Sequence, residues 1–558
     1  MLFDDAMRNP PNWSALVPEF KLRHQQLDAL VRIHKAMFVD DVDVVLLEAP
    51  TGVGKSIIEL ALCRFFNAFE QSAFIVTPQK TLQDQLAKLP SVKPMKGRGS
   101  YTCALVPELT AVQAPCLNNP GVRETNPQCS DTKCPYFKAL SEAKAAPIVA
   151  HNYASLIAQA HIGGHFGTRG LLCLDEGHTA ANWIRNYMSL ELTLNDLATI
   201  TTSQPPGDPN LFMGWFRAIM SEITQVPHGV PERIVTTIMR VFSHRQVYGV
   251  PAESLHEKYV EEMRELQPED REPYMSWACA ELSGTDVGLT PWHVAIEPTE
   301  GGGTKFVCTP IRVAPMAKTL TGLGGKVLIV TATILDQDLM LRELGMASMS
   351  NAEVIIEDAF DPNNRPIRKK YIGSMSYASA KSTFPNLVDE LHRIITYHAD
   401  ESGIIHTASH ALAYDVFRAL NGRYPLRKVV QMPREGRDGV IDRFLTGGYG
   451  PNAILIGPGL MEGIDAKDAS ARWQAMCKVP WPHRKDPVVS WFLDDPNPRA
   501  QRHGARWYMW KTAQQCVQGF GRVCRTPDDF GVTYLLDSGF EKILKSEFIP
   551  SYVMAAII

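Results

Sequence analysis

A glycine-containing turn between an apolar run and an amphipathic segment restricts the fold of this chain more than any other feature. Residues 42–47 (VDVVLL) predict a buried strand, and residues 57–65 have apolar side chains at the spacing of a helix. Glycines in the turn allow backbone N–H groups at the helix N-terminus to face a phosphate group. The sequence therefore predicts an α/β domain that binds a nucleotide at the carboxyl end of this strand. The contacting residues of the turn, A-P-T-G-V-G-K-S, would be Thr51, Gly52, Val53, Gly54, Lys55 and Ser56.

An acidic pair supplies the second half of the predicted site. The apolar run LLCL ends at Leu174, and Asp175 and Glu176 follow it, at the edge where α/β sheets place their chemistry. We expect Lys55 to neutralise the β- and γ-phosphates of ATP, and Ser56 and Asp175 to hold Mg²⁺. Glu176 is then the base that orients the attacking water.

A basic segment near the C-terminus predicts a second nucleotide-facing surface. Gln518, Arg522 and Arg525 lie in QGFGRVCRTPDDFG, and the two arginines are three positions apart, on one face of a helix. Such a face can bring an arginine to the γ-phosphate and stabilise the charge that develops during phosphoryl transfer. In the company of the phosphate-binding turn and the acidic pair, this segment predicts catalytic roles for all three residues.

Several motifs, in this order along the chain, resemble those of the XPD/DinG family of superfamily-2 DNA helicases. They are E-A-P-T-G-x-G-K-S, D-E-G-H, E-G-I-D, K-V-P-W-P-x-x-x-D-P and Q-x-x-G-R-x-x-R, and together they cover most of the chain. Three positions depart from the family pattern: Ser100 replaces Asn, Tyr153 replaces His, and Met461 replaces a bulky aromatic residue. We expect the contacts at these three positions to differ from those of the family.

The resemblance implies roles for residues outside the catalytic set. Arg23 and Gln26, ahead of the phosphate-binding turn, would read the adenine of ATP. Asp465, in MEGIDAKD, would also face the nucleotide. Thr331 and Thr333, in VLIVTATI, are similar to the Ser-Ala-Thr motif that links hydrolysis to movement. The implied cofactors at this site are ATP and Mg²⁺.

The implied fold is α/β, with two RecA-like parallel-sheet motor domains of which the first is interrupted twice. Residues 98–140 would form a small iron–sulfur insert, and residues 186–295 would form a helical arch domain. The remaining residues would form the first motor domain from 1–97, 141–185 and 296–345, and the second from 346–558.

Four of the eleven cysteines lie within one short segment rich in Pro and Asn. Twelve, twelve and four residues separate them, so that only the last pair has the short spacing of a zinc hook, which disfavours zinc without excluding it. The last cysteine is followed by Pro135, as at the end of ferredoxin ligand runs. The family resemblance implies a 4Fe-4S cluster here. Its ligands would be Cys103, Cys116, Cys129 and Cys134.

Basic and aromatic side chains surround these cysteines and predict contacts with nucleic acid. The family resemblance implies translocation on single-stranded DNA with 5′ to 3′ polarity and separation of forked or tailed duplexes, with the insert at the point where the strands part. Two other hypotheses stay open: an ATPase-idle subunit that recruits protein partners through the arch, and a redox-sensing DNA-binding protein. The basic and aromatic side chains that surround the cysteines are Lys93, Lys96, Arg98, Tyr101, Lys133, Tyr136, Phe137 and Lys138.

Composition limits the environment more than the activity. The net charge of −4 over 558 residues provides no global basic field, so that any DNA would have to be bound in a local groove. No tract is long enough to cross a membrane, and the N-terminus MLFDDAMRNPPNW lacks a basic region followed by an apolar run. We therefore expect a cytoplasmic protein that acts as a monomeric motor, with reduced cysteines.

Overall fold

The chain forms two compact units. The computed structural model describes residues 5–50, 52–78, 80–118, 121–162, 166–222, 292–299, 301–356, 361–461, 464, 466, 468–494, 498–524 and 529–558. The first unit comprises Met1–Leu47, Ser56–Thr331 and Gln337–Val354, and the second comprises Glu48–Lys55, Ala332–Asp336 and Ile355–Ile558. Three residues of the predicted site, Thr51, Asp465 and Arg525, lie outside the described residues.

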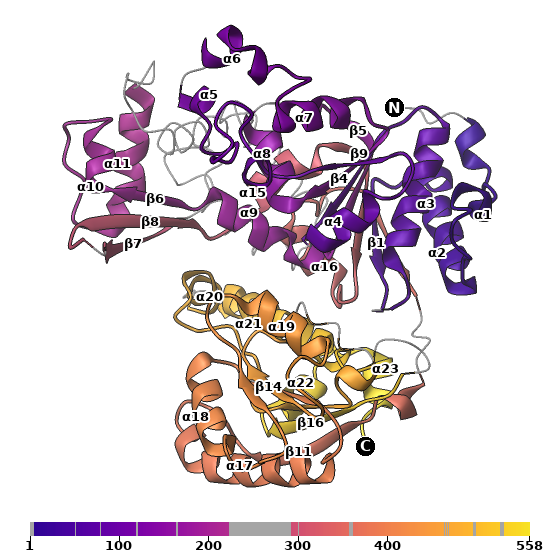
Figure 1. Ribbon diagram of the computed structural model, residues 1–558, viewed down its shortest axis with the longest axis vertical. Coiled ribbons are helices and arrows are strands. Elements are labelled where there is room, and N and C mark those ends of the chain that lie inside the picture. Colours follow the sequence, from indigo (N-terminus) through magenta and orange to yellow (C-terminus); the bar gives the residue numbers. More distant parts are fainter. Residues whose placement is uncertain are drawn as a thin grey trace. The chain divides into compact units, whose positions relative to one another are not determined.

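A seven-stranded sheet forms the centre of the first unit (Figure 1). Strands β1 and β2 consist of VVLLE and AFIVT, and all their residues are buried, as expected for strands covered on both faces. The pairings β5–β9, β2–β5, β2–β4 and β3–β4 are parallel. In spatial order the strands are β10 (Asn351–Ile355), β1 (Val44–Glu48), β9 (Gly324–Thr331), β5 (Arg169–Asp175), β2 (Ala73–Thr77), β4 (Ile148–Asn152) and β3 (Val92–Met95).

Helices connect and cover these strands. The strand β1 is followed by α3, as the apolar spacing predicts, and β4 leads directly into α8. The helices of this part are α1 (Trp13–Leu16), α2 (His24–His34), α3 (Lys55–Ala68), α4 (Lys80–Leu86), α7 (Pro135–Ala145), α8 (Tyr153–Ile162), α9 (Ala180–Met188), α15 (Ala314–Thr321) and α16 (Gln337–Glu343).

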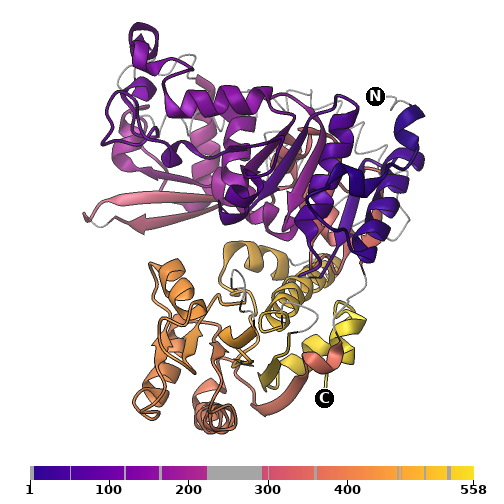
Figure 2. The same ribbon diagram turned by 45° about the vertical axis from the view of Figure 1, so that its right-hand side comes forward.

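The cysteine-containing insert enters the first unit between β3 and β4. Its described helices α5 (Pro115–Asn118) and α6 (Gly121–Thr125) are short, and they project away from the seven-stranded sheet in both views (Figures 1 and 2). The insert returns to the sheet through α7, whose first residue is Pro135.

The first unit also contains a three-stranded antiparallel sheet, which extends from the seven-stranded sheet as an arm (Figures 1 and 2). It contains β6 (Leu190–Thr193), β8 (Thr304–Pro310) and β7 (Trp292–Pro298), with α10 (Leu194–Ala198) and α11 (Pro209–Glu222). The predicted helical arch thus has a sheet at its described ends, and β7 crosses its predicted end at residue 295. The rest of the predicted arch, residues 223–291, lies outside the described residues.

A six-stranded sheet forms the second unit, and every pairing in it is parallel. The order is β11 (Ile367–Gly373), β16 (Val532–Asp537), β15 (Trp473–Met476), β12 (Gly403–His406), β14 (Ile454–Gly457) and β13 (Val429–Gln431). The helices are α17 (Ala380–Tyr397), α18 (His410–Leu420), α19 (Arg437–Leu445), α20 (Pro487–Leu493), α21 (Pro498–Phe520), α22 (Phe540–Leu544) and α23 (Ser551–Ala555). The predicted architecture of two parallel sheets is confirmed.

The boundary between the two units differs from the predicted residue 346. Strand β10 is part of the seven-stranded sheet, because Asp43 and Val44 both donate backbone hydrogen bonds to the carbonyl of Ser350. The main part of the second unit therefore begins at Ile355. No short motif marks β10 in the sequence, since its place depends on pairing with a strand about three hundred residues away.

Candidate functional site

The phosphate-binding turn has the backbone geometry that its glycines predict. Gly52 and Gly54 both have a φ of 87°, a left-handed conformation that disfavours a residue with a side chain. The side chain of Val53 is buried and anchors the turn, whereas Lys55, at the first position of α3, is partly exposed. The N-terminus of a helix that follows such a turn favours a phosphate group.

The acidic pair lies at the carboxyl end of β5. Asp175 is buried, and Glu176 adopts a left-handed backbone conformation with a φ of 47°. A non-glycine residue in this conformation costs about 1–3 kcal/mol, a strain that is common at functional sites. The strained residue is the one that the sequence predicts to orient water.

Tyr153, one of the three departures from the family pattern, supports this acidic pair. Its hydroxyl group donates a 2.8 Å hydrogen bond to the backbone carbonyl of Asp175. Burial raises the pKa of Tyr153, and the nearby charges of Asp175, Glu59 and Glu176 raise it further, so that the hydroxyl stays a donor. The ring stacks on Trp183, with centroids 6.3 Å apart. The sequence alone did not indicate this supporting role.

His178 connects the acidic pair to the end of β9. Its Nδ1 lies 2.8 Å from the hydroxyl oxygen of Thr331 and 3.5 Å from a carboxylate oxygen of Glu176. The threonine at position 331 provides the same hydroxyl group as the serine of the family pattern. Gly177 between them leaves no room for a side chain, because a Cβ would lie 2.5 Å from Ile329.

The second unit holds the residues that follow Thr331 through side chains of α21. Gln518 donates a 3.0 Å hydrogen bond to the hydroxyl of Thr333, and Gln514 donates a 2.8 Å bond to its carbonyl. Trp510 donates to the carbonyl of Ile334, at 2.7 Å. Sequence reasoning found Gln518 but missed Gln514 and Trp510. They lie four and eight positions earlier, on the same face of the helix, and this spacing could have indicated them.

Arg522 is buried and is bonded to the loop that follows β14. Its Nε donates a 2.6 Å hydrogen bond to the carbonyl of Met461, and its Nη1 donates a 3.0 Å bond to the carbonyl of Ile464. Met461, the third departure, thus contributes a backbone carbonyl at this point. In this structure Arg522 thus holds the backbone at Met461 and at Ile464.

The two residues predicted to read adenine lie at the start of α2. The side-chain oxygen of Gln26 accepts a 2.8 Å hydrogen bond from the backbone N–H of Arg23 and so helps to cap the helix. Gln26 is buried. Its position is therefore fixed by the helix, and its role toward a base stays a prediction.

Comparisons with known proteins give two family matches and a fold. The family described as "Helicase C-terminal domain" matches residues 391–553, and the family described as "Type III restriction enzyme, res subunit" matches residues 19–189. A solved structure of an XPD helicase is similar over 94% of this chain and 98% of its own, with a TM-score of 0.58 at 14% identity. The structure of S. tokodaii Xpd4 is similar over 96% and 99%, with a TM-score of 0.52 at 14% identity.

Curated relatives match over a short stretch. The regulator of telomere elongation helicase 1 of Rattus norvegicus is 31% identical over 100 residues, which are 16% of this chain and 8% of that protein. Its homologue in Caenorhabditis elegans is 31% identical over 104 residues, 17% of this chain and 10% of that protein. The chain therefore spans a tenth or less of the curated relatives it matches.

The fold is that of XPD helicases, and residues 391–553 match a helicase C-terminal domain, so the predicted resemblance to XPD/DinG-type superfamily 2 helicases is confirmed. The two matched regions contain both the phosphate-binding turn with the acidic pair and the basic segment of α21. None of the helices that the structure describes has the length and hydropathy needed to cross a bilayer.

Three of the four clustered cysteines are buried. Cys103, Cys129 and Cys134 are buried, and Cys116 is partly exposed. Burial raises the pKa of the Cys129 thiol, and the other three thiols raise it further. Among the residues that the structure describes, however, no three such side chains meet closely enough to form a ready metal site. The four sulfur atoms suit an iron–sulfur cluster in number and chemistry.

Arginines stack on the aromatic side chains of the insert. The guanidinium carbon of Arg123 lies 3.8 Å from the ring centre of Phe137, and that of Arg98 lies 4.5 Å from that of Tyr136. Two of the predicted DNA-contacting cations are instead paired with carboxylates, since Lys96 lies 2.5 Å from Asp84 and Lys93 lies 3.6 Å from Glu142. Sequence reasoning missed Arg123, because its contact with Phe137 spans fourteen positions.

Proposed function

We propose that this chain is an ATP-driven DNA helicase that translocates on single-stranded DNA from 5′ to 3′ and separates forked or tailed duplexes. The family supports the helicase activity and the use of ATP and Mg²⁺. The polarity, the preference for DNA, and the place of the insert at the strand-separation point are parts of the proposal alone.

The proposal rests on the contacts of two threonines, Thr331 and Thr333, which lie two positions apart in the chain. Thr331 is the last residue of the segment Ser56–Thr331 of the first unit. It contacts His178, which lies beside Glu176. Thr333 belongs to the second unit and is held by Gln518. A change at the nucleotide can therefore reach the second unit through three consecutive residues. Such a connection supports a motor in which hydrolysis drives movement of one domain.

The chemistry assigned to the site follows from the same residues. Lys55 would neutralise the β- and γ-phosphates, Ser56 and Asp175 would hold Mg²⁺, and Glu176 would orient the attacking water. Arg522 would stabilise the transferred phosphoryl group. Its guanidinium is permanently charged and suits the geometry of a phosphate group.

We infer that Cys103, Cys116, Cys129 and Cys134 hold a 4Fe-4S cluster. The burial of three of the four thiols suits metal ligation, and their irregular spacing supports a cluster over zinc. When bound, the cluster would supply a covalent cross-link between loops that have little apolar surface to bury. The residues around it, Arg98 and Arg123 with the aromatic rings, would then present a rigid surface to DNA.

ATP hydrolysis and strand separation test the motor. ATPase activity is measured with and without single-stranded DNA, and unwinding is measured on 5′-tailed and 3′-tailed duplexes. Removing the charge of Lys55 in Lys55→Ala should lower both activities about a hundredfold or more, as expected for loss of one fixed charge at a phosphoryl-transfer site. Lys381→Ala, at an exposed lysine of α17, is the matched control. Unwinding that survives Lys55→Ala, or that prefers 3′ tails, contradicts the proposal.

Metal analysis tests the cluster. Protein purified without oxygen should contain four iron and four sulfide per chain, the composition of a 4Fe-4S cluster. Cys134→Ser should lose this content and retain some ATPase activity while losing strand separation. Cys308→Ala, at a buried cysteine of β8, is the control. Colourless protein with stoichiometric zinc would show that the cluster assignment is wrong.

A further inference from the structure

A cavity opens at the amino edge of the six-stranded sheet. Its volume is about 480 Å³, and it lies where β11, β15 and β16 begin, beside the turn that follows α17. The residues that line it include none of those predicted to act on ATP. The cavity is therefore separate from the site described above.

The cavity contains an arginine without a carboxylate partner. Arg368 of β11 lies beside Tyr534, its register partner on β16. Within the described part of the chain, no carboxylate lies at ion-pair distance from Arg368. Arg472 differs, because its Nη1 lies 2.5 Å from the buried carboxylate of Asp529. Arg368 is thus the cation available to an anionic group, and a guanidinium suits phosphate geometry.

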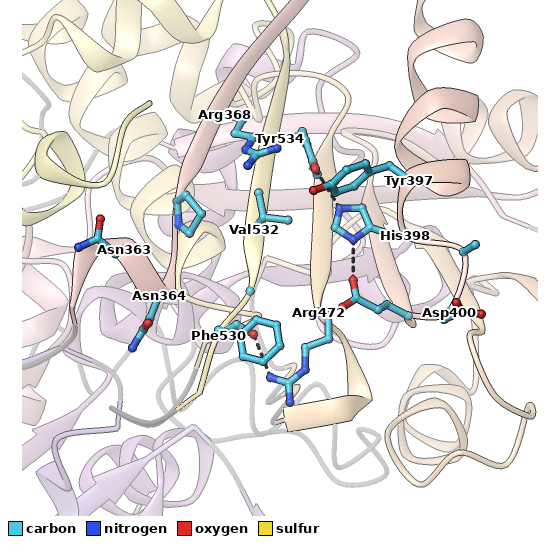
Figure 3. A pocket seen from close by; sticks show the side chains of 14 residues that line it. Asn363, Asn364, Arg368, Tyr397, His398, Asp400, Arg472, Phe530, Val532 and Tyr534 are labelled. Atoms are coloured by element: carbon cyan, nitrogen blue, oxygen red, sulfur yellow. Dashed lines mark hydrogen bonds and ion pairs between the residues drawn. The ribbon is translucent and has the colours of Figure 1, made fainter.

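Exposed aromatic rings stand at the mouth of the same cavity. Phe530 is 51% exposed, and the guanidinium of Arg472 lies 4.0 Å from the centre of its ring, so that one face of the ring is already covered. Tyr397, at the end of α17, is 72% exposed. Figure 3 shows Arg368 beside Tyr534 toward one end of the cavity and Phe530 beside Arg472 toward the other. Such rings can stack on a nucleobase at about 1–3 kcal/mol per base.

The turn after α17 forms one wall of the cavity and carries two carboxylates, Asp400 and Glu401. His398 connects two wall residues, with its Nε2 2.9 Å from the Tyr534 hydroxyl and its Nδ1 2.6 Å from the Glu401 carboxylate. Arg427 donates to the carbonyls of His398 and Glu401 and so fixes the turn. Carboxylates of Asp400 and Glu401 on this turn can accept hydrogen bonds from amino groups. A simple anion could pair with Arg368 but could not donate hydrogen bonds to the carboxylates of Asp400 and Glu401.

We propose that this cavity binds one nucleotide, with its phosphate on Arg368, its base stacked on Phe530 and an exocyclic amino group facing Asp400 and Glu401. A nucleotide has a phosphate for the cation, a base for the exposed ring and an amino group for the carboxylates. The cavity volume is within the range of small-molecule sites, about 300–1,000 Å³. The ligand is either a free mononucleotide or an unstacked base of a nucleic-acid strand. This site goes beyond the proposed motor and does not depend on it.

Binding is measured in the Lys55→Ala background, so that the phosphate-binding turn contributes little. Isothermal titration calorimetry and saturation-transfer NMR compare dGMP, dAMP, dCMP and dTMP with a short single-stranded oligonucleotide. Arg368→Ala and Phe530→Ala should each weaken binding about tenfold or more. Arg393→Ala, at an exposed arginine of α17, and Tyr414→Ala, at an exposed tyrosine of α18, are matched controls that should bind as the parent protein does.

The outcomes distinguish a free nucleotide from a base of a strand, and they show which results overturn the proposal. Binding of mononucleotides that bear an amino group, weaker for dTMP, supports a free nucleotide as the ligand. Binding of the oligonucleotide alone, lost in Arg368→Ala and Phe530→Ala, supports a base of a strand. Absence of any binding in the Lys55→Ala protein overturns the proposal, as does binding that both cavity variants retain. Thermal melting shows that each variant is folded, and ATPase activity in the Lys55-containing protein tests the motor separately.

Discussion

The cysteine insert and the six-stranded sheet achieve order by different means. The sheet buries large side chains, among them Trp473, Leu387 and Ile405, in one continuous apolar core. In residues 98–140, the described buried side chains are mainly cysteine and alanine, with Tyr136 and Leu140 as the large exceptions. A segment that buries so little apolar surface needs metal ligation or another cross-link to stay ordered. The difference indicates that the insert can be lost while the sheets remain folded.

Removing the largest core side chain of the sheet should have the largest effect. Trp473 is fully buried, stacks on His398 and lies so close to Gly403 that a Cβ there would be 1.9 Å from its ring. Trp473→Ala should lower the free energy of unfolding of the second unit by about 3–5 kcal/mol, because it leaves a large cavity. Hydrogen exchange in β12 and β15 measures this loss.

The same hydrogen-exchange experiment compares Trp473→Ala in the sheet with a substitution in the insert. Phe137→Ala in the insert removes a ring that is only partly buried, so exchange in β12 and β15 should not change. If Trp473→Ala affected the insert as strongly as the second sheet, the two regions would not be independently ordered.

Acid should destabilise the two parallel sheets by protonating buried histidines. The insert lacks this source of acid sensitivity, since residues 98–140 contain no histidine. Burial, with a smaller contribution from the charge of Arg522, lowers the pKa of His406 to about 4, although the hydrogen bond with Gln474 opposes the shift. The folded state therefore disfavours protonation. The contribution of neutral His406 is complete above a pH of about 6.5 and is lost as the pH falls toward 4, by on the order of 3 kcal/mol.

The variant His406→Asn should reduce this pH dependence, measured by chemical denaturation between pH 7 and about pH 4. Part of the dependence should persist, because burial also lowers the pKa of His151, in the seven-stranded sheet, to about 3. His392→Asn, at an exposed side chain, is the matched control. An unchanged profile in His406→Asn would show that His406 is already charged in the folded protein.

Local patterns in the sequence predicted the elements that carry the chemistry. The phosphate-binding turn, the strand that ends at Asp175 and the cysteine cluster are each contained in a short stretch, where composition fixes the backbone. The two parallel sheets followed from the family resemblance, and the comparisons confirm them.

Contacts between distant residues could not be predicted in this way. Gln514 reaches Thr333 across 181 positions, and Tyr153 reaches Asp175 across 22. The cavity beside Arg368 is made of four separate stretches, none of which has a motif of its own. Such contacts depend on how helices and strands pack, and neither periodicity nor spacing in the sequence reports that packing.

The smallest predicted effect concerns the arginine–aromatic contacts of the insert. Arg123 stacks on Phe137 at 3.8 Å and pairs with Asp131 at 2.7 Å, and both members of the ion pair are largely exposed. Arg123→Ala should therefore destabilise the insert by only about 0.5–1 kcal/mol, as expected for a partly exposed cation–π contact. Lys133→Ala, at another exposed cation of the insert, is the control.

A double-mutant cycle of Arg123→Ala and Phe137→Ala, read by hydrogen exchange within the insert, isolates the contact between the two side chains. The cycle should give a coupling energy of about 0.5–1 kcal/mol in protein that retains its metal, and none in Cys134→Ser. The reason is that the two side chains meet only if α6 and α7 are held together, and so little apolar surface cannot hold them. A coupling energy that persists in Cys134→Ser would mean that cation–π contacts order the insert without a metal, and the contrast with the sheets would then be one of degree.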